Sequence, residues 1–256
     1  MAKYDFYGKV ALVTGATSGI GQAAAVRLAR EGALVGVNHR ASGDPGKTLA
    51  LIKEFDGKAF AVEADMRKPD EIEQMVHETT KRGGRLDYLV SNAAINPLLQ
   101  WDTTTLDDYN RIQETNLRGT WVVCQAAAKQ MIAEGHKGAI VTVSSISAYV
   151  GAREQIVYCG TKAGIVMLTK GLATVLGQHG IRINCVLPGA ILTPMSSELV
   201  SHGSPVRKYY EDRTPLGYIG RPEEVANVIT FLLSDEASYM HSSEVLVDGG
   251  FITNAE

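Results

Sequence analysis

The sequence predicts an α/β fold: a single-domain, doubly wound parallel sheet (Rossmann fold) with helices on both faces. Two observations carry this prediction. Short apolar, β-branched segments alternate along the chain with longer amphipathic segments, and alternating strands and helices form parallel sheets. The apolar segments are continuously apolar, which is typical of strands buried on both faces. Because connections between parallel strands are right-handed, few other topologies remain.

Four strands are predicted in the first part of the chain. The segment "KVALVT" predicts the first, and the amphipathic segment behind it predicts a helix that ends at Gly32. A later helix begins with Pro69 and two acidic residues, which are favoured in a first turn. We expect strands at 9–14, 33–38, 58–64 and 86–91, with helices at 19–32, 46–55 and 69–82.

Three further strands are predicted in the rest of the chain, at 139–144, 181–187 and 244–248, with helices at 106–134, 156–178 and 222–234. The segment 189–224 has no clear strand and is rich in Gly, Pro and Ser. A long connection of this kind is typical of a lid or a binding loop. We therefore expect one domain over 1–256 with a substrate lid at about 190–215.

Composition excludes several classes of function. The chain has 256 residues, 45% hydrophobic and 21% charged, as in ordinary soluble proteins. Its net charge of −3 argues against nucleic acid or an anionic membrane as a partner. No apolar run is long enough to span a membrane, and no secretory signal is recognisable. The three cysteines have no metal-ligand spacing. We expect a cytoplasmic protein without a metal.

A glycine-rich turn, "TGATSGIG" (14–21), follows the first predicted strand and opens the first helix. Glycines allow a tight turn and a close approach of the backbone to a ligand. The free N–H groups and the dipole of the helix then bind an anion. In this position the motif predicts a nucleotide phosphate site more strongly than a glycine triad alone would.

The end of the second strand bears on the choice of cofactor. An acidic residue here would bind the adenosine ribose of NAD, but the chain reads Asn38, His39, Arg40. An arginine can bind a 2′-phosphate, so we expect NADP or both cofactors. Asp44 lies close enough in sequence to serve the ribose, which leaves NAD open. Asp65, after the third strand, is either an adenine contact or a helix cap.

A phenol and an ammonium lie four residues apart in "YCGTK", where Tyr158 and Lys162 share a helix face. A tyrosine can exchange a proton with an alcohol if its pKa falls from about 10 toward 7, which requires about 4 kcal/mol. An ammonium about 4 Å away contributes about 4 kcal/mol at an effective dielectric near 20. We therefore expect Lys162 to lower the pKa of Tyr158.

A serine is expected beside this pair. Ser145 follows the fifth strand, at the edge of the sheet where such folds bind ligands. Its hydroxyl could hold a substrate oxygen near Tyr158. Ser144 is the alternative, although neighbouring residues on a strand point to opposite faces.

Taken together, TGxxxGxG, a serine thirteen residues before YxxxK, and "LPG" after the sixth strand resemble the short-chain dehydrogenase/reductase family. The resemblance covers the chain from Lys9 to "VLVDGGF". It implies Tyr158 as the general acid/base, Lys162 as its partner, and Ser145 as the hydroxyl that polarises the substrate. It also implies that Asn116 holds a water in a proton relay.

The family resemblance, with the motifs above, implies a set of cofactor contacts. "LVSNAAIN" is similar to the family's NNAG segment, with Ser91 and Ala94 as departures that put fine cofactor geometry in doubt. The expected contacts are Gly15, Thr17, Ser18, Gly19, Ile20, Gly21, His39, Arg40, Asp65, Met66, Asn92, Ala93, Tyr158, Lys162, Pro188, Gly189, Ile191 and Thr193.

The residues expected to face the substrate are polar, and they include Ser145, Ser147, Asn96, Arg153, Gln155 and Tyr158. Such a lining suits a polyhydroxylated ligand, because an unpaired buried hydroxyl costs about 1–3 kcal/mol. The chain resembles aldose 1-dehydrogenases of the glucose and L-rhamnose types, which implies oxidation of a sugar at C1 to its lactone.

Two other functions are considered. A 3-oxoacyl-[acyl-carrier-protein] reductase would use the same residues and would need a basic patch, for which Arg207, Lys208 and Arg213 are offset by Glu211 and Asp212. A non-catalytic NAD(P)-sensing protein could share the fold, but the intact Ser/Tyr/Lys set argues against it. The resemblance also implies a homotetramer formed through the helices at 106–134 and 156–178 and the last strand.

Overall fold

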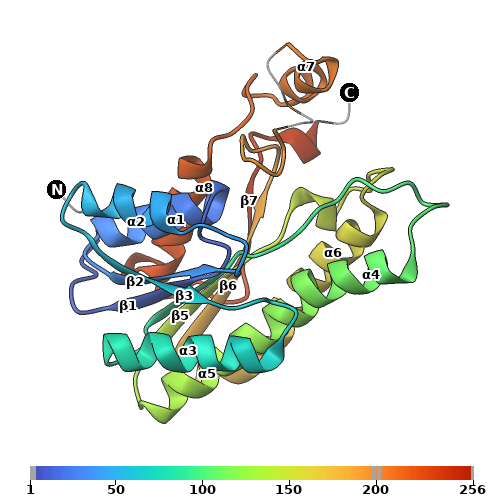
Figure 1. The fold of residues 1–256 in the computed structure, drawn as a ribbon. Helices are drawn as coiled ribbons and strands as arrows, with labels where there is room; N and C mark the ends of the chain where they lie inside the picture. The colour runs from blue at the N-terminus through green and yellow to red at the C-terminus, as the bar shows by residue number, and fades with distance from the viewer. Residues whose placement is uncertain (1–3, 198–199, 201–202, 255–256) are drawn as a thin grey trace.

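The computed structural model describes residues 4–197, 200 and 203–254. Its strands form one parallel sheet in the order β3-β2-β1-β4-β5-β6-β7 (Figure 1). The prediction of a doubly wound parallel sheet is confirmed. The strands are β1 (Val10–Val13), β2 (Leu34–His39), β3 (Lys58–Glu63), β4 (Tyr88–Ser91), β5 (Gly138–Val143), β6 (Ile181–Pro188) and β7 (Glu244–Val247).

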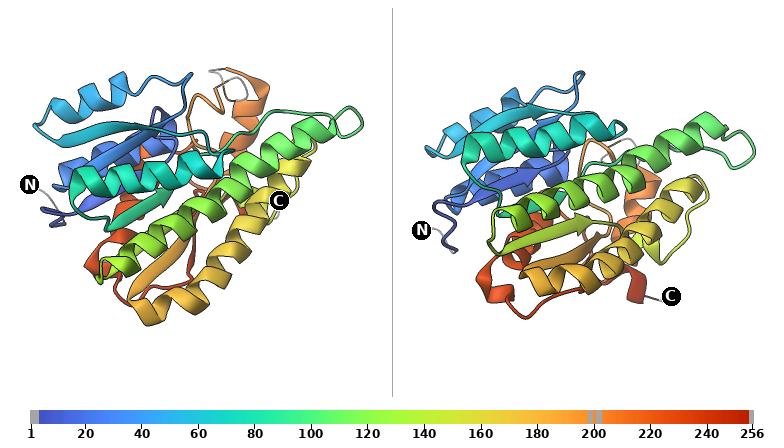
Figure 2. Two further views of the ribbon diagram at one scale, coloured as in Figure 1. Left: turned by 60° about the horizontal axis from the view of Figure 1, so that its bottom comes forward. Right: turned by 90° about the horizontal axis from the view of Figure 1, so that it is seen from below.

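Helices cover both faces of the sheet, as Figures 1 and 2 show. One face carries α1 (Gly19–Arg30), α2 (Gly46–Lys53) and α8 (Pro222–Leu233). The other carries α3 (Pro69–Gly83), α4 (Leu106–Gln113), α5 (Gly119–Ala133) and α6 (Ile156–Leu176). Each face has its own apolar core, with Leu28 and Ile229 in one and Ile72 and Met131 in the other. Burial on both faces explains why the central strands β1 and β4 are fully buried and almost continuously apolar.

Two differences from the predicted elements concern the site. The helix expected over 106–134 is interrupted by a π-helical turn, Glu114–Arg118, whose Asn116 is fully buried. Turns of this kind often occur at functional sites. The segment expected to lack a strand contains α7 (Pro205–Arg213) and a single parallel bridge between Ile191 and Gly220. Residues 198, 199, 201 and 202 of the expected lid lie outside the described residues.

The order of the strands determines where a ligand can bind. The order in which strands are added to the sheet reverses between β1 and β4, and ligands of such sheets bind beyond the carboxyl ends of the strands at this switch point. Val13 pairs with Val37 and with Val90, so the residues that follow these three strands meet at one edge. Within the described residues, no helix combines the length and the apolar character needed to cross a membrane.

Candidate active site

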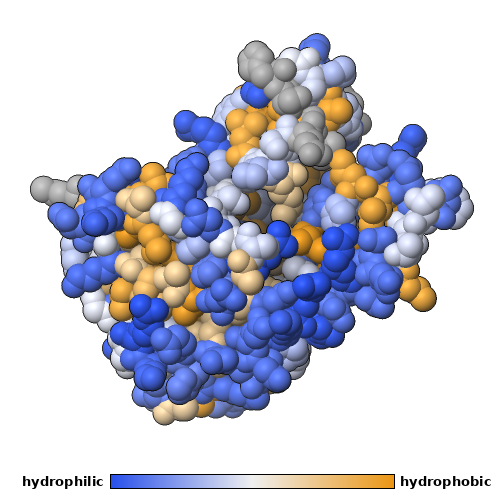
Figure 3. All heavy atoms as spheres, viewed as in Figure 1, coloured by the Kyte–Doolittle hydropathy of each residue, from blue (hydrophilic) through white to orange (hydrophobic). Residues whose placement is uncertain are grey.

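A cavity of about 560 Å³ lies at the carboxyl ends of the strands. The space-filling view shows the molecule hollowed below the part of the chain that contains α7 (Figure 3). Most of the residues expected to bind the cofactor or the substrate line this cavity. They are Gly15, Thr17, Ser18, Gly19, Ile20, His39, Arg40, Asp65, Met66, Asn92, Ala93, Asn96, Ser145, Ser147, Gln155, Tyr158, Lys162, Pro188, Gly189, Ile191 and Thr193.

The turn between β1 and α1 has the geometry of an anion cradle. Gly15 and Gly19 have φ values of 62° and 54°, in the left-handed region that favours glycine. The backbone N–H of Gly15 donates to Asn38 Oδ1 at 3.0 Å, which ties the turn to the end of β2. Within the described chain, the first turn of α1 has no acidic residue and Ser18 makes no side-chain cap. The helix N-terminus is therefore available to a negatively charged group.

A second set of hydrogen bonds holds the turn after β4 against the glycine turn. Thr14 Oγ1 accepts from the backbone N–H groups of Asn92, at 2.9 Å, and Ala93, at 3.0 Å. The Asn92 side-chain amide donates to the carbonyl oxygen of Thr14 at 3.0 Å. These bonds fix one wall of the cavity on the glycine turn. Thr14 was not among the residues expected to bind the cofactor. Its hydroxyl holds the backbone of Asn92 and Ala93, a contact that the sequence does not reveal.

Gly21, expected to contact the cofactor, does not line the cavity. A Cβ atom at this position would lie 2.3 Å from the carbonyl oxygen of Gly15 and 2.6 Å from Asn92 Nδ2. The residue is a glycine because the first turn of α1 packs directly on the glycine turn. A Cβ at Gly19 would lie 3.1 Å from Thr193 Cγ2, so the same helix also approaches the segment after β6.

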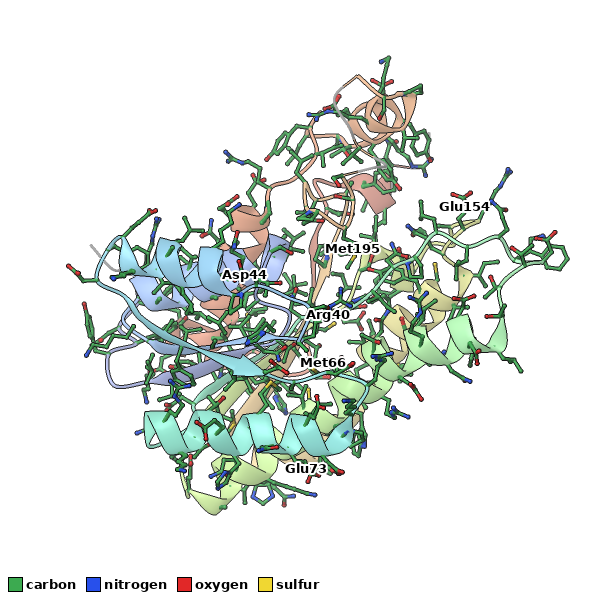
Figure 4. The ribbon with its side chains drawn as sticks, viewed as in Figure 1. Arg40, Asp44, Met66, Glu73, Glu154 and Met195 are labelled. Atoms are coloured by element: carbon green, nitrogen blue, oxygen red, sulfur yellow. The ribbon has the colours of Figure 1, made fainter. Side chains whose placement is uncertain are left out.

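Of the two charged residues near the end of β2, Asp44 accepts a hydrogen bond and Arg40 makes none through its side chain among the described residues. Asp44 Oδ1 accepts from the backbone N–H of Gly46 at 2.8 Å, at the start of α2. For Arg40, the described residues provide no side-chain hydrogen bond or ion pair, and Arg40 lines the cavity. In Figure 4, Arg40 lies centrally where the strands end, while Asp44 lies over α1 and α2. The free cation, and not the acid, faces the cavity.

Asp65, which was expected either to contact adenine or to cap a helix, is paired with Arg67. Arg67 Nε donates to both carboxylate oxygens at 3.0 Å, and the bond from this side chain holds the pKa of Asp65 below its ordinary value. The carboxylate also accepts from the backbone N–H of Arg67 at 2.9 Å. Both residues line the cavity, so any ligand at this end would meet a neutralised pair.

Tyr158 and Lys162 lie on the same face of α6 and both are buried. The Lys162 ammonium lies 5.3 Å from the centroid of the Tyr158 ring and donates to the carbonyl oxygen of Val143 at 2.9 Å. Ser144 Oγ donates to the carbonyl oxygen of Lys162 at 2.7 Å. These two bonds join α6 to the carboxyl end of β5. The hydroxyl of Ser144, the alternative to Ser145, is thereby engaged with the backbone.

Ser145 follows β5 and faces the tyrosine. Its Oγ accepts from the backbone N–H of Ser147 at 3.0 Å and forms a hydrogen bond with the Tyr158 side chain. The serine and the tyrosine thus present two hydroxyls to one point in the cavity. A substrate oxygen at that point could accept from one hydroxyl and exchange a proton with the other.

The pKa of Tyr158 differs from the expectation. Burial raises it to about 12, and the hydrogen bond with Ser145 lowers it only in part. Burial also lowers the pKa of Lys162 to about 8. An ammonium about 4 Å from the phenol oxygen would lower the pKa of the phenol only if both groups kept the effective dielectric near 20 of a partly solvated site. In the structure both groups are desolvated, which disfavours the phenolate and the ammonium alike.

Asn116 does not line the cavity. Its Oδ1 accepts from the backbone N–H of Ile95 at 2.8 Å, and its Nδ2 donates to the carbonyl oxygen of Ile95 at 2.9 Å. The same Nδ2 lies 3.3 Å from Thr161 Oγ1, beside Lys162. Both ends of the side-chain amide are engaged, so the side chain positions the turn after β4 against α6. The expected relay water would have to bond to the same amide atoms that already bind Ile95 and Thr161.

The substrate end of the cavity combines polar and apolar side chains. Asn96, Ser147 and Gln155 line it, whereas Arg153 is exposed and is not among the lining residues. Met195, Val200 and Tyr210 also line it and were not expected. They belong to the segment that was expected to be a lid, whose sequence has no apolar periodicity from which to tell the inward-facing residues.

The residues present fit a dinucleotide cofactor. At Gly15 and Gly19 a Cβ atom would lie 2.9 Å from Ala93 Cα and 3.1 Å from Thr193 Cγ2, so the backbone packs tightly where it lines the cavity. Arg40, whose side chain has no partner among the described residues, adds a cation to the lining. Cavities that hold ligands usually measure about 300–1,000 Å³, and this one falls within that range. Among the described residues, no cluster of His, Cys, Asp or Glu side chains could hold a metal ion.

Comparison with known proteins gives consistent matches over nearly the whole chain. The sequence profile described as enoyl-(acyl carrier protein) reductase matches residues 15–252. An L-rhamnose 1-dehydrogenase (NAD(P)(+)) of Sphingomonas sp. is 43% identical over 250 residues, covering 97% of this chain and 98% of the relative. One of Azotobacter vinelandii with the same name is 42% identical over 253 residues, covering 97% and 98%.

The fold is also found among solved structures. The crystal structure of a short-chain type dehydrogenase/reductase from Mycobacterium marinum superposes with a TM-score of 0.91. It is 36% identical to this chain, and the superposition covers 96% of each protein. Similarity at this identity and coverage extends to the sheet, its flanking helices and the edge at which the cavity lies.

Proposed function

This chain belongs to the short-chain dehydrogenase/reductase family and is an NAD(P)-dependent oxidoreductase acting on CH–OH groups, and we propose that it oxidises a sugar at C1. The proposed substrate is an aldose such as L-rhamnose or glucose, and the product is its lactone. One observation carries the proposal: hydroxyl and amide side chains of Ser145, Ser147, Asn96 and Gln155 line the cavity next to Tyr158. The names of the two relatives support the same class of substrate.

The polar lining matters because a sugar loses its water shell on binding. Each sugar hydroxyl that is left without a partner costs about 1–3 kcal/mol. Serine hydroxyls and amide groups both donate and accept, so they can pair with hydroxyls in several orientations. A site with these groups would reject a substrate without hydroxyls at the matching positions, because its own polar groups would then lose their partners.

In the proposed reaction, Ser145 holds the C1 oxygen by a hydrogen bond, and Tyr158 removes the proton of the C1 hydroxyl when its own hydroxyl is ionised, a form that becomes more populated as pH rises. A bound nicotinamide dinucleotide would supply the hydride acceptor. C1 thus loses a hydride and its hydroxyl oxygen loses a proton, so that C1 becomes the lactone carbonyl. In the reverse direction Tyr158 returns the proton as a general acid, and the raised pKa keeps it protonated near neutral pH. Lys162 fixes α6 on β5 through Val143 and keeps the tyrosine in place.

We propose that the cofactor is NADP, or both NADP and NAD. Arg40 faces the cavity without a partner among the described residues, and it can bind a 2′-phosphate by charge-assisted hydrogen bonds. Asp44, the acid that could serve an unphosphorylated ribose, is engaged at the start of α2. This arrangement favours a phosphorylated ribose without excluding the other.

The rival function, reduction of a 3-oxoacyl group on a carrier protein, has weaker support. The matching sequence profile is described as an enoyl-(acyl carrier protein) reductase, which also names a carrier-bound acyl substrate. The cations of α7 that could receive an acidic carrier are already paired. Arg207 Nε donates to Glu211 at 2.8 Å, and Lys208 Nζ donates to Asp212 at 2.7 Å. A non-catalytic sensor has no supporting observation, because the serine, tyrosine and lysine are all in place.

We further propose a cytoplasmic homotetramer. The three cysteines are free thiols, which suits a reducing compartment. Helices α5 and α6 expose apolar side chains at Trp121, Met167 and Val175, and β7 exposes Leu246. Faces of this kind are typical of contacts between subunits. Light scattering of the purified protein tests the assembly.

The sugar proposal is tested by following the absorbance of the reduced dinucleotide with a panel of aldoses and both cofactors. We expect turnover of at least one aldose with NADP, with the lactone as the detected product. Turnover of a 3-oxoacyl thioester without turnover of any aldose would replace the proposed function with the rival one. Tight dinucleotide binding without turnover of any alcohol or ketone would favour a sensor.

A further inference from the structure

Helix α7 is held in place by the C-terminal end of the chain. None of its residues is buried, and in Figure 1 it stands away from the layers of the sheet. The same view shows the last 3₁₀ turn, η5 (Phe251–Thr253), between α7 and the rest of the molecule. A helix without buried side chains has little apolar contact to fix its position. Its few specific contacts therefore determine where it lies.

Those contacts converge on Phe251, which is buried. The ring of Tyr210 packs on the ring of Phe251 with 5.5 Å between the centroids, and the guanidinium of Arg213 lies 5.2 Å from the same centroid. Arg213 Nη2 donates to the carbonyl oxygen of Asn254 at 3.3 Å, and Asn254 Nδ2 donates to the carbonyl oxygen of Arg213 at 3.0 Å. The last turn of α7 is thus joined to η5 by two ring contacts and two hydrogen bonds.

The segment before Phe251 is itself rigidly placed. The Asp248 carboxylate accepts from the backbone N–H groups of Gly250, at 2.9 Å, and Ile252, at 3.0 Å. Gly249 has a φ of 63°, and a Cβ atom there would lie 2.6 Å from Thr214 Cγ2, the residue that follows α7. This turn directly follows β7, so its contacts fix the position of α7 relative to the edge strand of the sheet.

Tyr210 connects this anchor with the cavity. Its side chain lines the cavity together with Met195 and Val200, and in the view of Figure 4 Met195 lies below α7, toward the strand ends. These three residues contribute apolar surface to the lining, whereas Ser145, Ser147 and Gln155 from other elements contribute polar groups. A sugar ring has the same two-sided character, with hydroxyls at its rim and C–H groups on its faces.

We propose that Tyr210 contacts the substrate, and that Phe251 is a positioning residue which sets Tyr210 over the cavity. The inference rests on the proposed function, because it assigns the aromatic ring to the C–H face of a sugar. It assigns one residue of the expected lid to the substrate, and it extends the proposed function to the C-terminal turn. Lids of this type exclude water and commit the substrate.

The test compares Tyr210→Ala, Phe251→Ala and the double variant with L-rhamnose and NADP⁺. We expect Tyr210→Ala to raise KM for the sugar by about 10–100-fold, as the loss of apolar contact with a substrate does. Phe251→Ala is expected to raise KM comparably and to leave kcat and the dissociation constant of NADPH within about twofold. Because both residues act through one contact, the double variant should be no worse than Tyr210→Ala. Phe251→Leu, which keeps an apolar side chain, should recover KM to within about threefold.

Two matched controls separate position from stability. Tyr239→Ala removes a fully exposed tyrosine. Phe55→Ala removes a phenylalanine that also packs under an arginine, Arg30, at 5.1 Å, but next to α2. Both controls should leave KM unchanged. Additive increases in the double variant, or a KM for Tyr210→Ala within twofold of wild type, would overturn the inference. Failure of the proposed function looks different: the wild type would then oxidise no aldose. In that case the same variants are compared on a 3-oxoacyl thioester, where an unchanged KM overturns the role of Tyr210 as well.

Discussion

The side-chain amide of Asn116 forms hydrogen bonds through both of its ends with the backbone of Ile95, at 2.8 and 2.9 Å. Ile95 lies in the turn after β4 and lines the cavity, while Asn116 lies in the π-helical turn between α4 and α5. The same amide reaches Thr161, next to Lys162. One buried side chain therefore joins the turn after β4 to α6, the helix that carries Tyr158 and Lys162.

We expect Asn116→Ala to lower the free energy of unfolding by about 1–3 kcal/mol, because both backbone groups of Ile95 lose their partner. Turnover should slow as well, since the wall and α6 are no longer joined. Chemical denaturation and steady-state kinetics measure the two effects. Asn110→Ala, an exposed asparagine on α4, is the control. A variant with wild-type stability and wild-type kcat would remove Asn116 from the site.

Replacement of Tyr158 by phenylalanine removes only the hydroxyl of the proposed acid/base. We expect kcat to fall by about 10²–10⁴-fold, the usual contribution of a positioned proton-transfer group. The dissociation constant of NADPH, measured by fluorescence, should change little because the ring remains. Tyr88→Phe removes a second buried phenol outside the cavity and should keep full activity. An active Tyr158→Phe variant would contradict the proton-transfer role.

The lowered pKa of Lys162 makes stability depend on pH. The unfolded lysine binds its proton up to about 10.5 and the folded one only up to about 8. Between these values the unfolded state holds more protons, so the contribution of Lys162 to stability rises with pH. The gap corresponds to about 3 kcal/mol. Near neutral pH, Lys162 therefore carries a penalty that is lost at alkaline pH.

Lys162→Met removes this titration and keeps most of the side-chain volume. We expect the stability of the variant relative to wild type to fall as pH rises from about 8 to 10, measured by urea denaturation. Up to pH 10 the buried Tyr158 keeps its proton because its pKa is raised to about 12. Lys129→Met, at an exposed lysine on α5, is the control for the substitution itself. A constant difference for Lys162→Met would mean that the buried amine is not desolvated.

Much of the fold follows from patterns that the sequence displays directly. Each strand is a short apolar segment next to an amphipathic one, so the order of the elements and the parallel sheet could be predicted. The π-helical turn at Glu114–Arg118 could not, because it depends on the bonds that Asn116 makes with a distant turn. Helix α7 has no buried residue and hence no apolar periodicity that would reveal it.

The candidate site divides in the same way. Ser145, Tyr158 and Lys162 were found because their spacing places them at a strand end and on one helix face. The shift of the Tyr158 pKa was predicted in the wrong direction. The sequence shows how far apart two residues lie along a helix, but it does not show how deeply burial removes them from water. Tyr210 was missed because α7 has no apolar periodicity in the sequence, and only the fold shows that this residue lines the cavity.

Arg40→Ala tests the choice of cofactor. Loss of a charge-assisted contact with a 2′-phosphate should raise KM for NADP by about 10–100-fold. The KM for NAD should stay within about twofold, because NAD has no phosphate at that position. Steady-state kinetics with both cofactors at saturating sugar measure the ratio. Arg30→Ala, at an exposed arginine on α1, is the control. Equal effects on both cofactors would show that Arg40 takes no part in the choice.

Gly21 provides a test of the cradle that does not depend on the substrate. A methyl group at this position would lie 2.3 Å from the carbonyl oxygen of Gly15, which is backbone and cannot move aside without moving the turn. It would also meet Asn92 Nδ2, which donates to the carbonyl oxygen of Thr14. Gly21→Ala must therefore displace α1 from the turn, and overpacking of this kind costs about 1–3 kcal/mol.

Because the N–H groups of the displaced turn no longer converge on one point, we expect Gly21→Ala to weaken NADPH binding by about tenfold or more. Calorimetric titration of the purified variant measures this at a temperature where it is still folded. The matched control is Gly171→Ala on α6, where the added methyl group meets no atom within 4 Å in the described structure. That variant should bind NADPH normally and gain about 0.5–1 kcal/mol from the better helix propensity of alanine. Normal NADPH binding by Gly21→Ala would place the phosphate site elsewhere, since a turn that tolerates this displacement cannot be the one that holds the anion.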